Sequence, residues 1–537
     1  MSSTHSQVRA VLLTALLVVT SFASIGSSAA QGERPTLRLG VAAADLQTLD
    51  PHFASGTQDR TIVDMVFNGL VRYVPGNAPD IEADLATEIP EPTMEGTSQV
   101  WTFALREGVM CHPSASTEAY ELTADDVVYS LEKSANVDRS AYAADYAGMT
   151  VAKVDDYTVT ITMETPLSPA LFLPKVANYS GGFIVCSQAV EALGDEAFKT
   201  APVGTGPFMF SQYNPQNAVT LVANDDYFRG QPKLAGVEAR YIADSTSLQL
   251  GLQARELDVI DGLNEAQWVD QINGEEGLIA DIFGAAEVTF VNFNTTVEPL
   301  NNPQVRQAIA YALNRDDFVA LSGEPVAAPV YSVVPSEFMD GGLTQEEAAA
   351  ADVEYAYDVE RAQQLMEEAG FADGFEMELI TSELDSYRRV YEVMQESLGE
   401  IGIELQINVV DHATMHEQIR LDVNPITVYV AFRPNADVYL TQFFSGAEAS
   451  GTMPVTNFAA YEAIDDLITQ ARAETDPAAQ AEIWKQANIQ ILTDMAAFPI
   501  ASTNLVYARA EGVDYGHELV SSLALYPQIT ELTTINQ

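Results

Sequence analysis

Apolar and polar residues alternate in several stretches of the first half of the chain, and this alternation predicts β-strands. Residues 100–106 and 156–163 alternate most clearly, and residues 34–45 have the pattern of a short buried strand that runs into a loop. Alternation puts every second side chain on one face, as a half-buried strand requires. A further strand-rich stretch is expected from residue 207 to about residue 242.

Other stretches space their apolar residues at helical intervals. Residues 61–71 form one such segment, and Thr123 is a good N-cap for a helix whose first turn carries two Asp residues. A helix N-terminus favours both a side-chain acceptor at the cap and negative charge in the first turn. Asn302 and Pro303 predict a second helix start, with Asn302 as the cap and Pro303 at the first helical position.

The second half of the chain alternates between predicted helices and strands. The expected elements are helix 245–256, strand 286–294, helix 358–369, strand 375–381, helix 386–400, strand 403–410, helices 460–473 and 477–494, and strand 497–506. Helices and strands that alternate at these lengths are typical of α/β lobes. We therefore expect an α/β fold whose central sheets are mainly parallel.

The N-terminus has the three-part form of a secretory signal peptide. Arg9 precedes an apolar run from Ala10 to Val19, and the small residues Ser28–Ala30 follow at the cleavage position. The apolar run is too short to span a bilayer comfortably, and no Cys follows it as a lipid-anchor site. We expect residues 1–30 to be removed, and the mature chain to act in the periplasm without a lipid anchor.

Charge excludes some classes of partner. The chain has 537 residues, enough for two to four domains, and its 77 acidic against 25 basic residues give a formal charge of −52. Nucleic acid and anionic lipid both attract a basic face, so neither is an expected partner. The acids are dispersed along the chain, which fits either a surface kept hydrated in a saline habitat or ordinary solubility through net charge.

The chain has two cysteines, Cys111 and Cys186, which match no zinc, haem or thioredoxin spacing. In an exported protein they form either a disulfide or two separate buried thiols. The sequence leaves both alternatives open, because a disulfide requires Cα atoms within roughly 4.4–6.8 Å.

The sequence contains none of the common catalytic motifs. It has no GxSxG elbow, P-loop, HExxH or GxGxxG segment. His412 and His416 lie four residues apart beside Asp411 and Glu417, a spacing that suits either a metal or an exposed polar helix face, and we expect the second. These observations predict a protein that is not an enzyme and needs no cofactor and no metal.

Four segments, in order along nearly the whole chain, carry a resemblance to a known family. They are Thr48–Pro51 with the following helix 61–71, Trp101–Val109 with Leu122–Leu131, Val203–Phe208, and Val305–Arg315. Each segment is weak alone, but the set in this order and spacing is specific. The chain resembles the family 5 extracytoplasmic solute-binding proteins, the dipeptide-, oligopeptide- and nickel-binding receptors of ABC importers.

The resemblance implies a two-lobed periplasmic-binding-protein fold of class II, a Venus-flytrap joined by a two-strand hinge. Strands 286–294 and 497–506 sit where the hinge crossings are expected. The implied lobes are residues 34–288 with an inserted subdomain at about 81–200, residues 289–506, and a C-terminal return over 507–537. The implied partners are a peptide or small-molecule solute and ABC permease subunits in the inner membrane, with the receptor itself a monomer.

One departure from the family pattern concerns the solute. In the peptide-binding members an Asp three residues after a Trp pairs with the peptide amino group, and here Tyr429 and Phe432 occupy those two positions. Arg433 follows directly and is either a two-pronged contact for an anion or a surface arginine paired with one of many acids. Asp437 is an alternative cation partner. The solute is therefore a peptide, another small organic molecule such as a carboxylate or saccharide, or a metal complex.

The resemblance also places other residues in the cleft. The full set of expected contacts, including the residues just named, is Gly56, Thr57, Gln58, Asp59, Tyr179, Ser180, Gly181, Asn292, Asn294, Tyr387, Arg388, Tyr429, Phe432, Arg433, Asn435 and Asp437. Asn292 and Asn294 are expected near the hinge, the alternative being a turn that closes the strand. For Tyr387 the alternative is packing beside a helix start. Replacing Arg433 by Ala is expected to abolish or weaken binding and to leave the fold intact.

Overall fold

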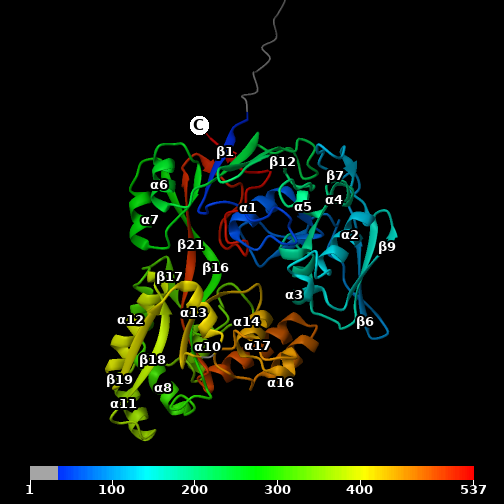
Figure 1. Ribbon diagram of the computed structural model, residues 1–537. Coiled ribbons are helices and arrows are strands. Elements are labelled where there is room, and N and C mark those ends of the chain that lie inside the picture. Colours follow the sequence, from blue (N-terminus) through cyan, green and yellow to red (C-terminus); the bar gives the residue numbers. More distant parts are fainter. Residues whose placement is uncertain (1–33, 422, 537) are drawn as a thin grey trace, which may run out of the picture. The chain divides into compact units, whose positions relative to one another are not determined.

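A nine-stranded mixed sheet runs through the computed structural model, which describes residues 34–421 and 423–536 (Figure 1). Eight strands follow the order β12-β13-β14-β1-β15-β21-β16-β20, and β17 pairs with β21. Their bounds are β1 (Thr36–Val41), β12 (Phe208–Asn214), β13 (Ala218–Ala223), β14 (Gly236–Tyr241), β15 (Val259–Asp261), β16 (Leu278–Phe293), β17 (Ala327–Pro329), β20 (Ile426–Phe432) and β21 (Ala497–Ala510).

The expectation of mainly parallel sheets is wrong for this sheet. Only β1 runs parallel to its neighbours, β14 and β15, and every other pair in the sheet is antiparallel. The connection from Asn214 to Ala218 is too short for a crossover, so β12 and β13 must form a hairpin. A parallel pair with a helical crossover does occur in a separate small sheet, where β18 (Phe375–Ser382) pairs with β19 (Ile403–Val410).

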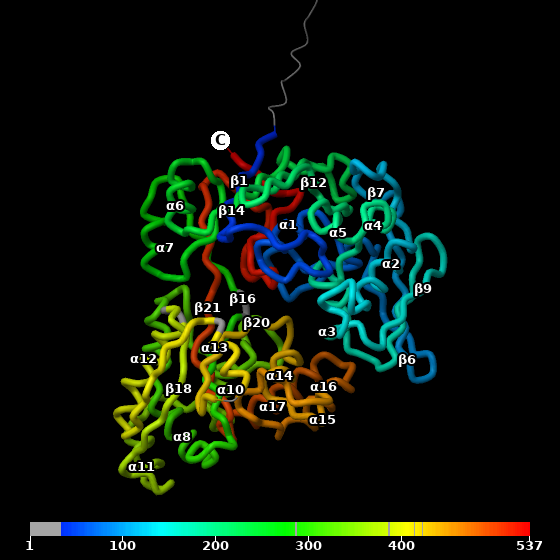
Figure 2. The backbone as a smooth tube through the Cα atoms, in the orientation of Figure 1, coloured from blue at the N-terminus to red at the C-terminus, as the bar shows by residue number. Residues whose placement is uncertain are grey.

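Two long strands, β16 and β21, connect the two lobes and run side by side (Figures 1 and 2). Both extend beyond the predicted ranges, and their pairing is interrupted between Phe283 and Glu287. At this interruption the Gly284 amide donates to the Val520 carbonyl oxygen at 2.9 Å. A Cβ on Gly284 would lie 1.9 Å from the Phe338 ring, so a larger residue here would require that ring to move.

Lobe one adds helices and a small antiparallel sheet to its part of the large sheet. The small sheet has the order β5 (Thr93–Glu95), β6 (Ser98–Ala104), β10 (Thr158–Met163) and β9 (Met149–Asp155). Helix α2 (Ala124–Ser134) starts at Thr123 as predicted, with a full capping box that Asp126 completes. A disulfide joins Cys111 to Cys186, with Cα atoms 5.9 Å apart.

The predicted helix 61–71 is displaced toward the N-terminus. The structure has helix α1 at Thr57–Val66, followed by strands β2 (Asn68–Gly69) and β3 (Val71–Tyr73). Asn68 and Gly69 pair with β11 (Phe183–Ile184), a long-range pairing that ends the helix early. Leu70 is buried as predicted, but it lies between β2 and β3 and not in a helical stripe.

A fully buried ion pair holds the loop that leads into α1. Lys133 of α2 donates to both carboxylate oxygens of Asp50 at 2.8 Å, and both side chains are inaccessible to solvent. Lys133 Nζ also lies 3.2 Å from Nδ1 of His52, while His52 Nε2 lies 2.9 Å from the Phe183 carbonyl oxygen. Burial and the Lys133 charge keep the pKa of His52 well below its usual range. The Leu-Asp-Pro segment therefore has a structural explanation.

Lobe two packs helices on both faces of its part of the large sheet. Its elements are α8 (Pro303–Ala312), α9 (Arg315–Val319), α11 (Val359–Glu368), α12 (Asp385–Gly399), α13 (His412–Ile419), α14 (Ala436–Phe444), α16 (Asp465–Ala473) and α17 (Pro477–Thr493). Asn302 caps α8 with Pro303 in its first turn, as predicted. Helix α16 begins at Asp465 and not at residue 460, because the chain turns there with Ala460 at positive φ.

The remaining elements are short. They are β4 (Ile81–Ala83), β7 (Met110–Cys111), β8 (Tyr120–Glu121), β22 (Val513–Asp514), β23 (Thr534–Ile535), α3 (Pro169–Phe172), α4 (Ser187–Leu193), α5 (Asp195–Phe198), α6 (Ser245–Gln253), α7 (Ala266–Asn273), α10 (Gln345–Ala350), α15 (Ala447–Ser450), and the 3₁₀ helices Ala143–Tyr146, Leu173–Val176 and Ser180–Gly182.

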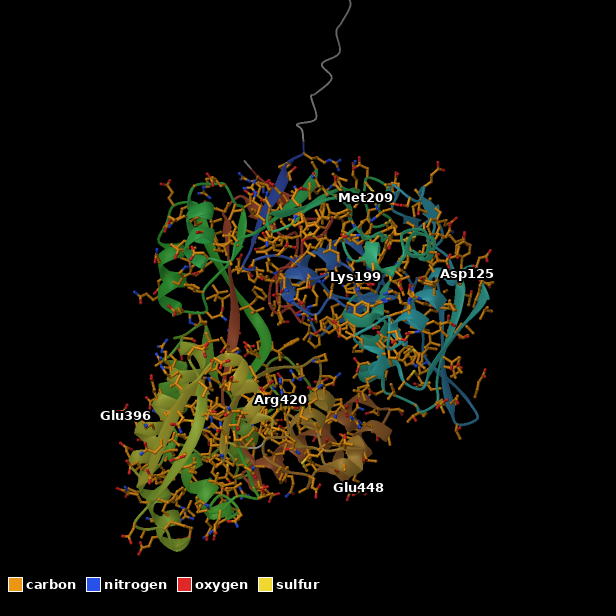
Figure 3. The ribbon with its side chains drawn as sticks, viewed as in Figure 1. Asp125, Lys199, Met209, Glu396, Arg420 and Glu448 are labelled. Atoms are coloured by element: carbon orange, nitrogen blue, oxygen red, sulfur yellow. A yellow bond between two sulfur atoms is a disulfide. The ribbon has the colours of Figure 1, made fainter. Side chains whose placement is uncertain are left out.

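Acidic side chains lie exposed on several elements. Figure 3 labels three of them, Asp125 on α2, Glu396 on α12 and Glu448 on α15. The expected signal peptide, residues 1–30, lies outside the described residues. Among the helices of residues 34–421 and 423–536, none combines the length and apolar composition needed to cross a membrane.

Candidate functional site

In lobe one, Arg60 links the two groups of predicted contact residues. The guanidinium Nη1 donates to the Tyr179 hydroxyl at 3.0 Å, and its carbon lies 5.3 Å from the centre of the Tyr179 ring. Arg60 comes from the first turn of α1, directly after Gly56–Asp59, and Tyr179 directly precedes Ser180 and Gly181. The two predicted groups, about 120 residues apart in the chain, therefore meet at one arginine that the sequence analysis did not name.

Helix α1 begins at the first of these groups. Gly56 is its N-cap, and the Thr57 carbonyl oxygen accepts a hydrogen bond from the Thr61 hydroxyl at 2.7 Å. The Tyr241 hydroxyl donates to the Gln58 carbonyl oxygen at 3.5 Å. Asp59 is buried, accepts from the Gln47 amide at 2.8 Å, and has its pKa raised by burial.

Tyr179, Ser180 and Gly181 lie in a tightly held segment. The Ser134 hydroxyl of α2 donates to the Gly181 carbonyl oxygen at 2.6 Å, and Ser180 has a φ of 51°. The disulfide at Cys186 fixes the end of the same segment, just after β11. The position of the Tyr179 ring is thus set by α2, by β11 and by the cross-link to Cys111.

Arg60 has fewer hydrogen bonds than the other buried arginines of the described chain. It is 8% exposed, and its buried Nε has no hydrogen-bond partner among the described residues. Arg306, 5% exposed, donates to the carbonyl oxygens of Leu300, Asp494 and Met495. Arg315 is satisfied in the same way by three carbonyl oxygens.

In lobe two the predicted aromatic residues gather in one cluster. The Tyr387 ring lies 5.1 Å from the His412 ring and 6.0 Å from the His416 ring. Tyr429 contacts Phe443 at 5.4 Å and Phe458 at 5.2 Å. Tyr387 and Tyr429 both border the small apolar cluster of Met415, Ile419 and Phe458. Tyr387 therefore packs against neighbouring side chains of lobe two, which was the alternative considered for it.

Arg433 lies beside this cluster, and two of its three nitrogens donate hydrogen bonds within lobe two. Its Nε donates to the Gln442 side-chain oxygen, and its Nη1 donates to the Phe432 carbonyl oxygen at 2.6 Å. The guanidinium carbon lies 4.8 Å from the centre of the Phe443 ring. The sequence analysis left two alternatives for Arg433, an anion contact or a surface ion pair. In the structure its neighbours are neutral: the Gln442 side chain, the Phe432 carbonyl oxygen and the Phe443 ring.

Three further predicted contacts already have partners within lobe two. Arg388 lies 3.1 Å from Glu392 in an ion pair one helical turn away. Asn435 caps α14 by accepting from the Val438 amide at 3.0 Å. Asp437 accepts two hydrogen bonds from Arg472, at 2.9 and 3.1 Å. Asp437 is therefore already neutralised by a cation of its own lobe.

Asn292 and Asn294 are buried at the C-terminal end of β16 and just after it. They lie at the end of β16 away from the interrupted pairing, and are 0% and 3% exposed. The Asn294 side-chain oxygen accepts from the amide and hydroxyl of Thr296, at 3.1 and 2.7 Å, which closes the turn after the strand. Asn292 donates to the Thr427 carbonyl oxygen at 3.3 Å.

A carboxylate that the sequence analysis missed lies opposite Phe432. Glu287 of β16 pairs in register with Phe432 of β20 and with Thr503 of β21, so the three side chains share one face. Glu287 and Thr503 line a cavity of about 400 Å³ together with Arg389 of α12. Within the described residues the Glu287 carboxylate has no side-chain hydrogen bond or ion pair, and burial raises its pKa.

Other cavities lie nearby. One of about 520 Å³ is lined by Lys175, Asn435, Asp437 and Arg472, and another of about 550 Å³ is lined by Gly284 and Phe338. Among the residues that the structure describes, no three or more His, Cys, Asp or Glu side chains are placed together so as to hold a metal ion. In the same part of the chain, no hydrogen bond or ring contact joins the Arg60–Tyr179 pair to the aromatic cluster of lobe two.

The comparison with known families decides the class. Residues 80–494 match the family described as bacterial extracellular solute-binding proteins, family 5 Middle. The chain belongs to this family. Its members are extracytoplasmic binding proteins of ABC importers, and the family is one of binding proteins and not of enzymes. The chain is therefore a solute-binding protein with the two-lobed fold of its relatives.

Individual relatives cover most of the chain. The structure of MoaA from A. tumefaciens R10, in complex with mannopinic acid, is 37% identical, with a TM-score of 0.76 over 94% of this chain and 100% of that one. Heme-binding protein A of Haemophilus influenzae is 26% identical over 470 residues, 83% of each chain. The glutathione-binding protein GsiB of Escherichia coli K12 is 25% identical over 496 residues, 88% of this chain and 90% of the relative.

Proposed function

We propose that this family member is a periplasmic receptor that captures a peptide-class solute between its lobes. It delivers the solute, as a monomer, to permease subunits in the inner membrane. We propose that the lobes follow the predicted bounds and that the chain crosses between them near the interrupted pairing of β16 and β21. Solute binding at a lobe interface favours the closed arrangement of the hinge.

The observation that carries the peptide class is the position of Glu287. The peptide-binding relatives place a carboxylate where this chain has Phe432, and Glu287 lies directly across the strand pair from Phe432. A carboxylate that is partly desolvated and unpaired among the described residues costs free energy, which a solute ammonium group recovers on binding. Glu287 is therefore proposed as the partner of the peptide amino group, in place of Asp437.

A second candidate solute is a non-peptide carboxylate. The 37% identity to a protein that was crystallised with mannopinic acid favours this class, since the other relatives reported above reach only 25–26%. Both candidates contain a carboxylate group. They differ in whether a peptide bond and a peptide amino group are recognised.

Isothermal titration calorimetry with the dipeptide Met-Leu, N-acetyl-Met-Leu and mannopinic acid tests the proposal. The acetyl group removes the ammonium charge, so the wild type should bind Met-Leu about 30-fold or more tightly than the acetylated form. Glu287→Gln should lose that preference, whereas the control Glu378→Gln, an exposed glutamate on β18, should keep it. Binding of mannopinic acid alone would replace the peptide class by the second candidate.

The same samples test the rival class, an exported hydrolase. Mass spectrometry of the ligand after long incubation should recover it unchanged. Appearance of any product from Met-Leu would contradict a receptor role.

A further inference from the structure

Arg60 is a buried cation with few hydrogen-bond partners and no ion pair among the described residues. The acidic residues outnumber the basic ones by 77 to 25, so carboxylate partners are abundant. Yet Arg60 makes no ion pair among the described residues, and its one side-chain hydrogen bond goes to a neutral phenol. Desolvating a guanidinium is costly unless a charged or well-directed acceptor replaces water.

The acids nearest to Arg60 in sequence form no ion pair with it among the described residues. Asp59 Oδ1 accepts from the Gln47 amide at 2.8 Å, and the buried Asp59 Oδ2 has no hydrogen-bond partner in the same part of the chain. Asp64, one helical turn further along α1, accepts from Asn178 at 2.7 Å and from Gln528 at 3.1 Å. The missing partner of Arg60 is therefore not supplied by its own helix.

Aromatic residues surround the guanidinium from distant parts of the chain. Tyr179 lies beneath it, and the Tyr526 hydroxyl donates to the Arg60 carbonyl oxygen at 2.9 Å. The Tyr142 hydroxyl donates to the Ala54 carbonyl oxygen at 2.6 Å, which ties the loop before α1 to the same place. Phenol rings lower the local dielectric response and orient the planar fork, both of which strengthen a two-pronged contact to a carboxylate.

The arrangement also contains a second buried donor without a partner. Tyr73 packs edge-on against Tyr179, with ring centres 6.2 Å apart, and its buried hydroxyl has no partner among the described residues. Two such polar groups around one ring are unusual, because buried polar atoms are generally satisfied. The contrast with Arg306 and Arg315, each held by carbonyl oxygens, indicates that Arg60 is not a structural arginine of the same kind.

We propose that Arg60 is the anion anchor of lobe one, and that its guanidinium pairs with a carboxylate of the captured solute. The proposal rests on the receptor function above and adds to it the class of solute: one that carries at least one carboxylate. With Glu287, which pairs across the strands with Phe432 of β20, as the partner for a cationic group, the proposed site contains one charge of each sign. Gly56–Asp59 and Tyr179–Gly181 then hold Arg60 in position from its two sides.

A comparison of an acid with its amide tests the anchor. Calorimetry on the full chain compares Met-Leu with Met-Leu amide, which lacks the carboxylate, and includes mannopinic acid. The wild type should prefer the acid by about 30-fold or more, and Arg60→Gln should bind the acid and the amide within about 3-fold of each other. Arg60→Lys keeps the charge but loses the fork, so it should retain part of the preference.

The control is Arg361→Gln, which removes the same charge from an exposed arginine of α11 that pairs with Glu368 at 3.4 Å. It should keep the wild-type preference, and thermal unfolding should show that all three variants are folded. An unchanged preference in Arg60→Gln, or equal binding of acid and amide by the wild type, overturns the anchor and leaves the receptor function standing. A wild type that binds none of the three compounds overturns the proposed solute classes and the anchor with them. If only mannopinic acid binds, Arg60→Gln must weaken its binding, and an unchanged affinity refutes the anchor.

Discussion

Arg60 in lobe one and Arg433 in lobe two both hold a guanidinium over an aromatic ring. Arg433 lies over Phe443, and Arg60 lies over Tyr179, at 4.8 and 5.3 Å from the ring centres. Arg433 also donates to Gln442 and to the Phe432 carbonyl oxygen, whereas Arg60 donates only to a phenol hydroxyl and keeps a buried Nε unsatisfied within the described chain. Arg433 is thus held by acceptors of its own lobe, whereas Arg60 keeps, in the same described chain, an unsatisfied nitrogen, which is the basis of the proposed anchor.

This difference shows that the place of a residue in a sequence motif is weaker evidence for ligand binding than the hydrogen-bond partners that surround it in the structure. Arg433 drew attention because it follows the position of the missing Asp, but its Nε and Nη1 already have acceptors on α14 and β20. Arg60 directly follows the predicted contact segment Gly56–Asp59. Its proposed role as an anchor follows only from the side chains around it, such as Tyr179. We expect function where a charged group lacks a partner that the fold could have supplied.

The largest expected effect concerns the cross-link behind Tyr179. Replacing both Cys111 and Cys186 by Ser opens a loop of 75 residues, and should lower the free energy of unfolding by about 2–5 kcal/mol. Urea denaturation measures this change. Because Cys186 closes the segment that holds the Tyr179 ring, solute binding should weaken as well. An unchanged urea midpoint would show that the cross-link does not constrain the lobe-one site.

The second prediction sets the two arginines against each other in stability. Arg433→Ala should lower the free energy of unfolding by about 1–3 kcal/mol, because it removes two hydrogen bonds and a ring contact. Arg60→Gln should cause no loss, since it removes a desolvated charge without an ion pair among the described residues. Urea denaturation of both variants, with Arg361→Gln as the reference, gives the comparison. If Arg433→Ala abolishes binding at unchanged stability, the sequence interpretation of Arg433 is right and the contrast drawn here is wrong.

Local patterns in the sequence predicted much of the fold. The features that these patterns did not predict depend on contacts between distant segments. The caps Thr123 and Asn302 depend on residues within one helical turn, and both helices begin where expected. The end of α1 depends on pairing with β11, more than 100 residues away, and was misplaced. Arg60 was missed for the same reason, because Tyr179 and Tyr526 lie 119 and 466 residues from it.

The direction of the sheet strands and the position of Glu287 also depend on contacts between distant segments, so the sequence did not predict them. Helix–strand alternation in the second half suggested parallel sheets, but β16 and β21 run antiparallel between the lobes. Glu287 was one residue of a predicted strand, and its importance appears only from its register with Phe432 and Thr503. The family resemblance supplied the class of protein, while the residues that face the solute remain predictions.

A smaller effect should follow from removing the hydroxyl that positions Arg60. Tyr179→Phe keeps the ring beneath the guanidinium and deletes its one side-chain acceptor, at 3.0 Å. A single hydrogen bond of this kind contributes about 1 kcal/mol, so binding of a carboxylate solute should weaken by about 5-fold. Calorimetry measures this, with the exposed Tyr357→Phe as the matched control. A loss as large as that of Arg60→Gln would mean that Tyr179 contacts the solute itself.

The smallest effect is on the stability of the empty protein, and concerns the opposite charge, Glu287, which lies across the strand pair from Phe432. Burial raises the pKa of Glu287 above its ordinary value of 4.5, so the ionised carboxylate destabilises the folded state at neutral pH. That penalty fades as pH falls through the raised pKa and is absent below the ordinary value, where both states are protonated. Glu287→Gln should therefore have a higher urea midpoint than the wild type at pH 7 and the same midpoint near pH 4. Tyr387 and Tyr439, whose pKa values respond to the Glu287 charge, stay neutral throughout this range and do not confuse the readout. A lower midpoint at pH 7 would show that Glu287 already has a stabilising partner, and would leave Arg60 as the only unpaired charge on which the comparison of the two lobes depends.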